Sequence, residues 1–247
     1  MRLSSSYQET KNILIAIIIL TIIFSFNDKT AVFNPEHYSI NFILTLVIVT
    51  FSILVHLLVL KLISLHYGVS SEFTLWSFEE IANISPISWR KIKKSFRFIY
   101  SGSLFAFLLT LVSNGKAYFT AISTFKIENT KTLGRTFPNI TEKEIANMAF
   151  LMILAHFILA LTFRSINVKQ GVLINSWVMI WNLLPVSSLL GSKIFFGSRT
   201  LYIFTLVLAV ISLGLIGVLT ATQTLLISIF TASIIAGIWF WKLEYIK

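Results

Sequence analysis

The chain has 247 residues, of which 56% are hydrophobic and 12% are charged, and its formal net charge is +10. Soluble domains carry roughly 25% charged residues, so the composition excludes an ordinary soluble protein and predicts an all-α polytopic membrane protein. A basic excess in such a protein is typical of cytoplasmic loops, and we expect no nucleic-acid partner. Because the chain has no cysteine, disulfides, thiolate catalysis and thiolate-bound metals are excluded.

Six apolar stretches are long enough to be predicted as transmembrane helices. They lie at approximately 13–26, 40–65, 145–163, 172–190, 201–219 and 225–241. The first follows a basic start and lacks a convincing cleavage site, so we interpret it as an uncleaved helix. None of the six stretches contains an aspartate or a glutamate.

A seventh and shorter apolar run, 98–112, decides the topology. If it crossed the membrane, lysine and arginine would be divided almost equally between the two sides. If it enters and returns on the same side, sixteen of the twenty Lys and Arg residues lie inside and three lie outside. The positive-inside rule favours this second arrangement. We therefore predict six crossings, a membrane-inserted non-crossing segment and two cytoplasmic termini, in the plasma membrane.

The region between the second and third predicted spans contains two strand-like segments. Glu72–Trp76 alternates polar and apolar residues, and Tyr118–Phe125 is rich in β-branched and aromatic residues. We expect a small β-hairpin-like insertion beside the helices. Thr141 and Glu144 form a capping-box pattern that predicts the start of the next helix. No linker or repeat divides the chain, so 1–247 is predicted to be a single integral membrane domain.

A basic cluster follows the first strand-like segment. It consists of Arg90, Lys91, Lys93, Lys94 and Arg97. In the predicted topology these side chains lie at the inner membrane surface, where each base attracts anionic lipids by about 1 kcal/mol. We interpret the cluster first as a topology determinant and second as a site for anionic lipids.

His56 lies in the middle of the second predicted span. An H-E-x-x-H zinc helix needs a glutamate directly after the first histidine and a second histidine one turn later. This chain has Leu57 and Leu60 at those two positions. The surrounding sequence nevertheless resembles archaeal members of the site-2 family of intramembrane zinc metalloproteases, in which a lysine, a Tyr-Gly turn and an aromatic-rich strand follow the zinc helix. Here these are Lys61, Tyr67-Gly68 and 72–76.

The resemblance continues in the fourth predicted span. The N-x-x-P-x-x-x-L-D-G signature of the same family is similar to the segment from Asn182 to Gly191, with Pro185 matched and Leu190 in place of the metal-binding aspartate. The stretch 149–163 resembles the family's small-residue helix in degraded form, with His156 at one of its polar positions. Together the matches cover roughly 40–199, and they imply a site-2-protease-like core.

The departures from the family pattern concern the metal chemistry. A catalytic zinc needs about three protein ligands and a carboxylate to move protons. Of the expected ligands only His56 is present, so Leu57, Leu60 and Leu190 are vestigial positions and we predict no catalytic residues, no metal and no cofactor. A pair of His56 with His156 stays open, although two separate structural histidines are the favoured interpretation. The resemblance also implies a helix break at Asn182 and Pro185 that either holds a partner segment or is purely architectural.

These observations favour a catalytically inactive membrane protein. We predict that it acts as a binding or scaffold subunit whose partners are other membrane proteins. Two alternatives stay open. One is an active intramembrane metalloprotease with a rebuilt site, which the lack of carboxylates in the predicted spans disfavours. The other is an accessory subunit of a transporter or channel, which would need more polar residues inside the bundle.

Overall fold

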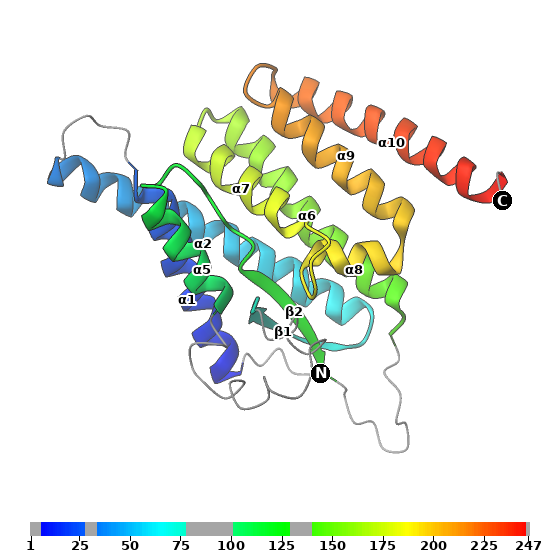
Figure 1. Ribbon diagram of the computed structural model, residues 1–247, viewed down its shortest axis with the longest axis horizontal. Coiled ribbons are helices and arrows are strands. Elements are labelled where there is room, and N and C mark those ends of the chain that lie inside the picture. Colours follow the sequence, from blue (N-terminus) through cyan, green and yellow to red (C-terminus); the bar gives the residue numbers. More distant parts are fainter. Residues whose placement is uncertain (1–5, 28–33, 78–100, 129–139, 246–247) are drawn as a thin grey trace. The chain divides into compact units, whose positions relative to one another are not determined.

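The computed structural model describes residues 6–27, 34–77, 101–128 and 140–245. Within these residues the chain is mostly helical and has one two-stranded sheet (Figure 1). It divides into two compact units. The first comprises Met1–Thr136 with Ser187–Leu189, and the second comprises Phe137–Val186 with Leu190–Lys247. Each unit is described by itself, and the single domain over 1–247 stays a prediction.

Among the described residues, four helices are long and apolar enough to cross a membrane, judged by length and composition. They are Tyr7–Ser25, Pro35–His66, Glu142–Ser165 and Ala221–Lys242. These helices coincide closely with four of the six predicted spans, and they support integration into a membrane. The helices at the two remaining positions have only 14 and 17 residues. Six crossings and cytoplasmic termini therefore stay predictions.

The first unit is built on two helices, α1 (Tyr7–Ser25) and α2 (Pro35–His66), which pack together (Figure 1). Helix α1 begins well before the predicted position 13, because the Ser6 side chain caps it by accepting a hydrogen bond from the Glu9 backbone N–H at 3.0 Å. Helix α2 has 32 residues and is about 48 Å long at 1.5 Å per residue. It therefore exceeds the roughly 30 Å of a hydrocarbon core.

The sheet consists of β1 (Ser70–Leu75) and β2 (Ser123–Glu128), which pair antiparallel with Phe73 opposite Phe125. Two strands are confirmed in this region, with other bounds than predicted: β1 begins before Glu72 and ends before Trp76, and only Ser123–Phe125 of the second predicted segment lie in β2. The pair is not a simple hairpin, because α5 (Ser101–Val112) lies between the strands in the sequence. With 12 residues, α5 is about 18 Å long and too short to cross alone. Its membrane insertion stays a prediction.

Trp76 joins several parts of the first unit. Helix α5 approaches it so closely that a Cβ added at Gly102 would lie 2.4 Å from the Trp76 carbonyl oxygen. The Trp76 indole N–H donates a hydrogen bond to the Ser187 carbonyl at 2.9 Å, and the Thr124 hydroxyl donates to the carbonyl of Ser188. These two bonds make the distant segment Ser187–Leu189 part of this unit.

The second unit is organised around α6 (Glu142–Ser165). This helix contacts the four helices that follow it in the chain, which are α7 (Lys169–Asn182), α8 (Leu190–Gly197), α9 (Arg199–Leu215) and α10 (Ala221–Tyr245). The predicted capping box is confirmed. The Glu144 carboxylate accepts from the Thr141 backbone N–H at 2.6 Å, and the Thr141 hydroxyl accepts from the Glu144 backbone N–H at 3.3 Å. Helix α6 is the most buried of the four long helices, because 61% of its apolar 18-residue stretch is buried inside the protein. It therefore forms the core of this unit.

The predicted span 172–190 is not one continuous helix, and its crossing of the membrane stays a prediction. Helix α7 (Lys169–Asn182) ends before Pro185, and α8 (Leu190–Gly197) begins after it. Proline has no N–H to donate and disfavours helical backbone in the residue before it. The connecting segment also contains Ser188 in the left-handed conformation at φ +64°. The break is thus complete and not a kink within one helix.

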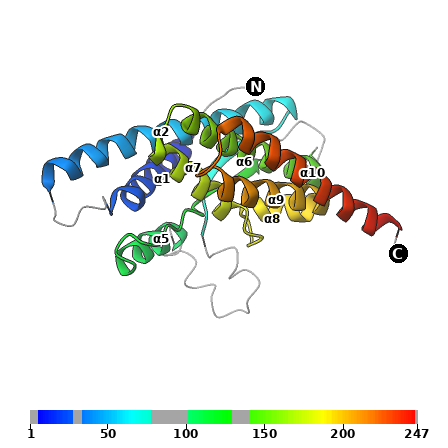
Figure 2. The same ribbon diagram turned by 90° about the horizontal axis from the view of Figure 1, so that it is seen from above.

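The last two helices, α9 (Arg199–Leu215) and α10 (Ala221–Tyr245), pack against each other (Figure 2). Ala232 and Ala236 on α10 are buried, and small side chains of this kind allow close helix packing. Only 22% of the apolar 18-residue stretch of α10 is buried. Most of this helix is therefore left to face lipid or another protein.

Candidate functional site

The predicted zinc-helix position lies on the buried face of α2. His56, Leu60 and Ser64 follow one another at intervals of one turn and are at most 3% exposed. The His56 ring packs edge-on against Phe73 of β1, with 6.1 Å between ring centroids and an interplanar angle of 86°. The sequence alone did not predict this aromatic contact, because it depends on how β1 docks on α2.

The side chains around His56 do not fit a zinc ion. Leu60, at the position of the second histidine, is fully buried, and Leu57, at the position of the base, is partly buried. Neither offers a donor atom. Across residues 6–27, 34–77, 101–128 and 140–245, no group of three His, Asp or Glu side chains is placed to hold a metal. The predicted lack of catalysis and cofactors stays a prediction.

A polar cluster lies between α1, α2 and β1 in the same unit. The Glu9 carboxylate is 2.7 Å from the Lys61 ammonium and accepts a hydrogen bond from the Phe73 backbone N–H at 2.9 Å. Lys61 also donates to the Ser71 carbonyl at 2.7 Å, and the Asn12 amide donates to the Phe73 carbonyl at 3.4 Å. We use the name strand-edge cluster for Glu9, Asn12, Lys61 and the β1 backbone groups that these side chains bind.

The strand-edge cluster covers the edge of β1 that faces away from β2. Backbone groups at an open sheet edge invite pairing with other chains, and in a membrane they need partners inside the protein. Here side chains from two helices supply those partners. Glu9 is 1% exposed, and its charge is balanced by Lys61. The cluster therefore fixes β1 on both helices and needs no ligand to do so.

Glu9 was missed by the sequence analysis, which placed the first span at 13–26. The available signal was the pattern Ser6-Tyr7-Gln8-Glu9, because a serine followed three residues later by glutamate is typical of a helix start. Helix α1 does begin there, and Ser6 is its N-cap. A carboxylate is thus present inside the apolar part of the fold.

In the second unit, His156 belongs to a buried chain of hydrogen bonds. Its Nδ1 is 2.9 Å from the Asn175 side-chain oxygen, and the Asn175 amide donates to the Gly171 carbonyl at 2.9 Å. With the amide oriented in this way, His156 carries its proton on Nδ1. Asn175 is fully buried and His156 is 1% exposed. The arrangement ties α6 to α7.

The signature residues surround the end of α7. The Asn182 amide donates to the Val178 carbonyl at 2.8 Å, within its own helix. A Cβ added at Gly191 would lie 2.0 Å from the Leu183 carbonyl oxygen, so this glycine allows the start of α8 to approach the end of α7. Pro185 is exposed and Leu190 is fully buried. These residues shape the break between the two helices.

The structure thus places Gly191 against Leu183, which directly follows Asn182, but His56 and His156 belong to different units. A metal pair of the two histidines stays untested. The basic cluster from Arg90 to Arg97 lies outside the described residues.

Comparison of the chain with protein-family models, with curated proteins and with solved structures finds no match. The resemblance to the site-2 family therefore rests on the residues quoted from the sequence.

Proposed function

We propose that this protein is a catalytically inactive, site-2-protease-like membrane protein that acts as a binding or scaffold subunit of a membrane complex. The observation that carries the proposal is the packing around His56. The face of α2 that would hold a metal is occupied by Leu60 and closed by Phe73. A buried histidine packed in this way contributes to the core of the unit, and this packing supports a structural role for His56.

The polar groups near His56 also support a structural role. Glu9 and Lys61 form an ion pair between α1 and α2, and both also bind the β1 backbone. A general base must reach the proton it removes within hydrogen-bond distance. Glu9 is instead committed to the Phe73 N–H and to Lys61, so it serves the docking of β1.

A binding role is supported by the surface of α10. This helix is long enough to span a membrane, but only 22% of its apolar 18-residue stretch is buried. Gly237 lies on it with no atom within 4 Å of an added Cβ. Small residues on an exposed face allow a second helix to approach closely. We therefore assign this face of α10 to a helix of a partner membrane protein.

The catalytic part of the proposal is tested on the purified full-length chain. Zinc content is measured by elemental analysis, and cleavage of membrane-embedded peptides is measured by gel and mass spectrometry. We expect neither zinc at one ion per chain nor cleavage. His56→Ala is compared with His66→Ala, whose parent histidine is exposed. Zinc or proteolysis that disappears in His56→Ala but not in His66→Ala would contradict the proposal.

The binding part is tested by co-purification from native membranes in mild detergent. We expect a partner membrane protein at fixed stoichiometry, and we expect Gly237→Trp to reduce its recovery because the larger side chain blocks close approach. Thr222→Trp, at an exposed position of the first turn of α10, is the matched control. Equal recovery with Gly237→Trp and with the unchanged chain would argue against this face of α10.

A further inference from the structure

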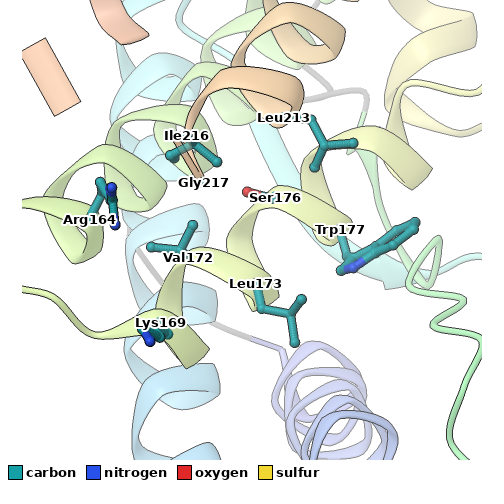
Figure 3. A pocket seen from close by; sticks show the side chains of 9 residues that line it. All are labelled: Arg164, Lys169, Val172, Leu173, Ser176, Trp177, Leu213, Ile216 and Gly217. Carbon is teal, nitrogen blue, oxygen red and sulfur yellow. The ribbon is translucent and has the colours of Figure 1, made fainter. Parts of the chain in front are cut away.

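A cavity of about 310 Å³ lies in the second unit, between the end of α6, the first half of α7 and the end of α9 (Figure 3). Its volume is at the lower end of the roughly 300–1,000 Å³ typical of small-molecule sites. It belongs neither to the strand-edge cluster nor to the break after Asn182. Its lining has two different ends, one basic and one apolar.

The basic end is formed by Arg164, in the last turn of α6, and Lys169, the first residue of α7. Figure 3 shows both side chains on the same side of the cavity. In the part of the chain that the structure describes, neither has a carboxylate within ion-pair distance. The Arg164 Nε–H donates to the Leu219 carbonyl at 3.2 Å, which leaves its remaining guanidinium donors for a ligand.

The apolar end is formed by side chains of α7 and α9. Trp177 and Leu213 lie at the end opposite the two cations in Figure 3, and Val172, Leu173 and Ile216 line the space between. A small soluble anion would leave this apolar surface unused. A molecule with both an anionic group and a hydrocarbon chain would contact the whole lining.

Ser176 adds a second polar feature inside the cavity. Its side chain is on the face of α7 turned toward Ile216 and Gly217 in Figure 3. The residue is 3% exposed, and its hydroxyl has no hydrogen-bond partner within the described residues. A buried hydroxyl without a partner is costly. A ligand oxygen placed in the cavity would accept its proton and remove that cost.

We propose that this cavity binds an anionic phospholipid. The phosphate binds Arg164 and Lys169, an ester oxygen next to it accepts from Ser176, and one acyl chain lies along the apolar lining toward Trp177. The cations lie at the end of a helix long enough to span a membrane, where lipid headgroups are found. Basic pockets between transmembrane helices are known to bind lipid headgroups.

The proposal is tested by native mass spectrometry on the delipidated full-length chain in detergent. The chain is titrated separately with phosphatidylglycerol, phosphatidylcholine and inorganic phosphate. Two bases near a phosphate predict about a 30-fold preference for phosphatidylglycerol over phosphatidylcholine, which corresponds to about 2 kcal/mol. Inorganic phosphate alone should neither bind at comparable concentration nor displace the lipid.

Charge variants separate the site from the general basicity of the chain. Arg164→Gln with Lys169→Gln should abolish the preference for phosphatidylglycerol. Arg199→Gln with Lys242→Gln removes the same charge from exposed positions of the second unit that do not line the cavity, and it should keep the preference. Lys169→Gln alone, which leaves the Arg164 bond to Leu219 intact, should reduce it about 5-fold.

A steric pair tests the cavity itself. Gly217 lines the cavity and Gly214 does not, and an added Cβ would meet no atom within 4 Å at either position. Gly217→Leu should lower phosphatidylglycerol binding at least 10-fold, whereas Gly214→Leu should leave it unchanged. Both variants are checked for folding by their melting temperature. If Gly217→Leu does not fold, the phosphatidylglycerol binding of Lys169→Gln is used to test the proposal instead. Equal binding of the two phospholipids, displacement of lipid by phosphate, or equal losses in a variant and its control would each overturn the proposal.

Discussion

The ion pair between Glu9 and Lys61 makes a quantitative prediction, because one carboxylate holds three elements together. Glu9→Ala removes a charge that is 2.7 Å from Lys61 and an acceptor that is 2.9 Å from the Phe73 N–H. Leaving a buried N–H without an acceptor costs about 1–3 kcal/mol. Breaking a buried ion pair costs about 3–5 kcal/mol, but the Lys61 side chain is 27% exposed and can reach water. We therefore expect Glu9→Ala to lower the free energy of unfolding by about 3 kcal/mol in total.

Glu9→Gln separates the two contributions. The amide oxygen can still accept from the Phe73 N–H, so only the charge is lost, and we expect about half of the effect of Glu9→Ala. Lys61→Met removes the other charge and leaves Glu9 buried without a cation. The double variant Glu9→Gln with Lys61→Met should be less destabilised than the sum of the two single variants, since exchanging both members of a buried ion pair is often close to neutral.

The assay is unfolding of the full-length chain in detergent, followed by tryptophan fluorescence, with hydrogen exchange of the peptide covering Ser70–Leu75. Glu9→Ala should lower the unfolding free energy and speed exchange in β1, because the strand loses one of its edge partners. Glu36→Gln, which changes an exposed acid in the first turn of α2, is the control. If Glu9→Ala and Glu36→Gln had the same stability and the same exchange in β1, the role assigned to the strand-edge cluster would be refuted.

Three further substitutions test the second unit by thermal unfolding in detergent. Gly191→Ala should destabilise the chain by about 2 kcal/mol or more, since its Cβ would lie 2.0 Å from the Leu183 carbonyl oxygen; a stability equal to that of the unchanged chain would contradict the close approach of α7 and α8. Gly237→Ala, in open space within α10, should instead stabilise by up to about 1 kcal/mol through helix propensity, and a loss would show that the site is crowded. Asn175→Leu should cost about 2–4 kcal/mol because it leaves the buried His156 and a backbone carbonyl without their partner; a neutral result would refute the hydrogen-bond chain.

Much of the local structure followed directly from the sequence. Hydropathy located the four long helices, because membrane spans need a continuous apolar run whatever their neighbours are. The Thr141–Glu144 capping box marked the start of α6, since its hydrogen bonds are made within one turn. The lack of donor atoms at Leu57 and Leu60 was also a local property of the chain.

The sequence analysis failed where distant residues compete with local preference. A break at Asn182 and Pro185 was expected within the run 172–190, but the local sequence does not show that the next helix starts only at Leu190 or that Gly191 packs against the end of α7. Glu9 was placed outside the first span because a carboxylate lowers hydropathy. Its partners, Lys61 and the Phe73 N–H, come from elements more than fifty residues away in the chain.

The sequence by itself determined that this is a helical membrane protein and that Leu57 and Leu60, which offer no metal-binding atoms, follow His56, because both are matters of composition and residue identity. Only the tertiary structure decided what surrounds that histidine. It brought Phe73 against the ring and used Glu9, Asn12 and Lys61 to close the edge of β1. It also formed the cavity beside Arg164 and Lys169. Such features depend on side-chain packing between elements far apart in the chain, which no local pattern specifies.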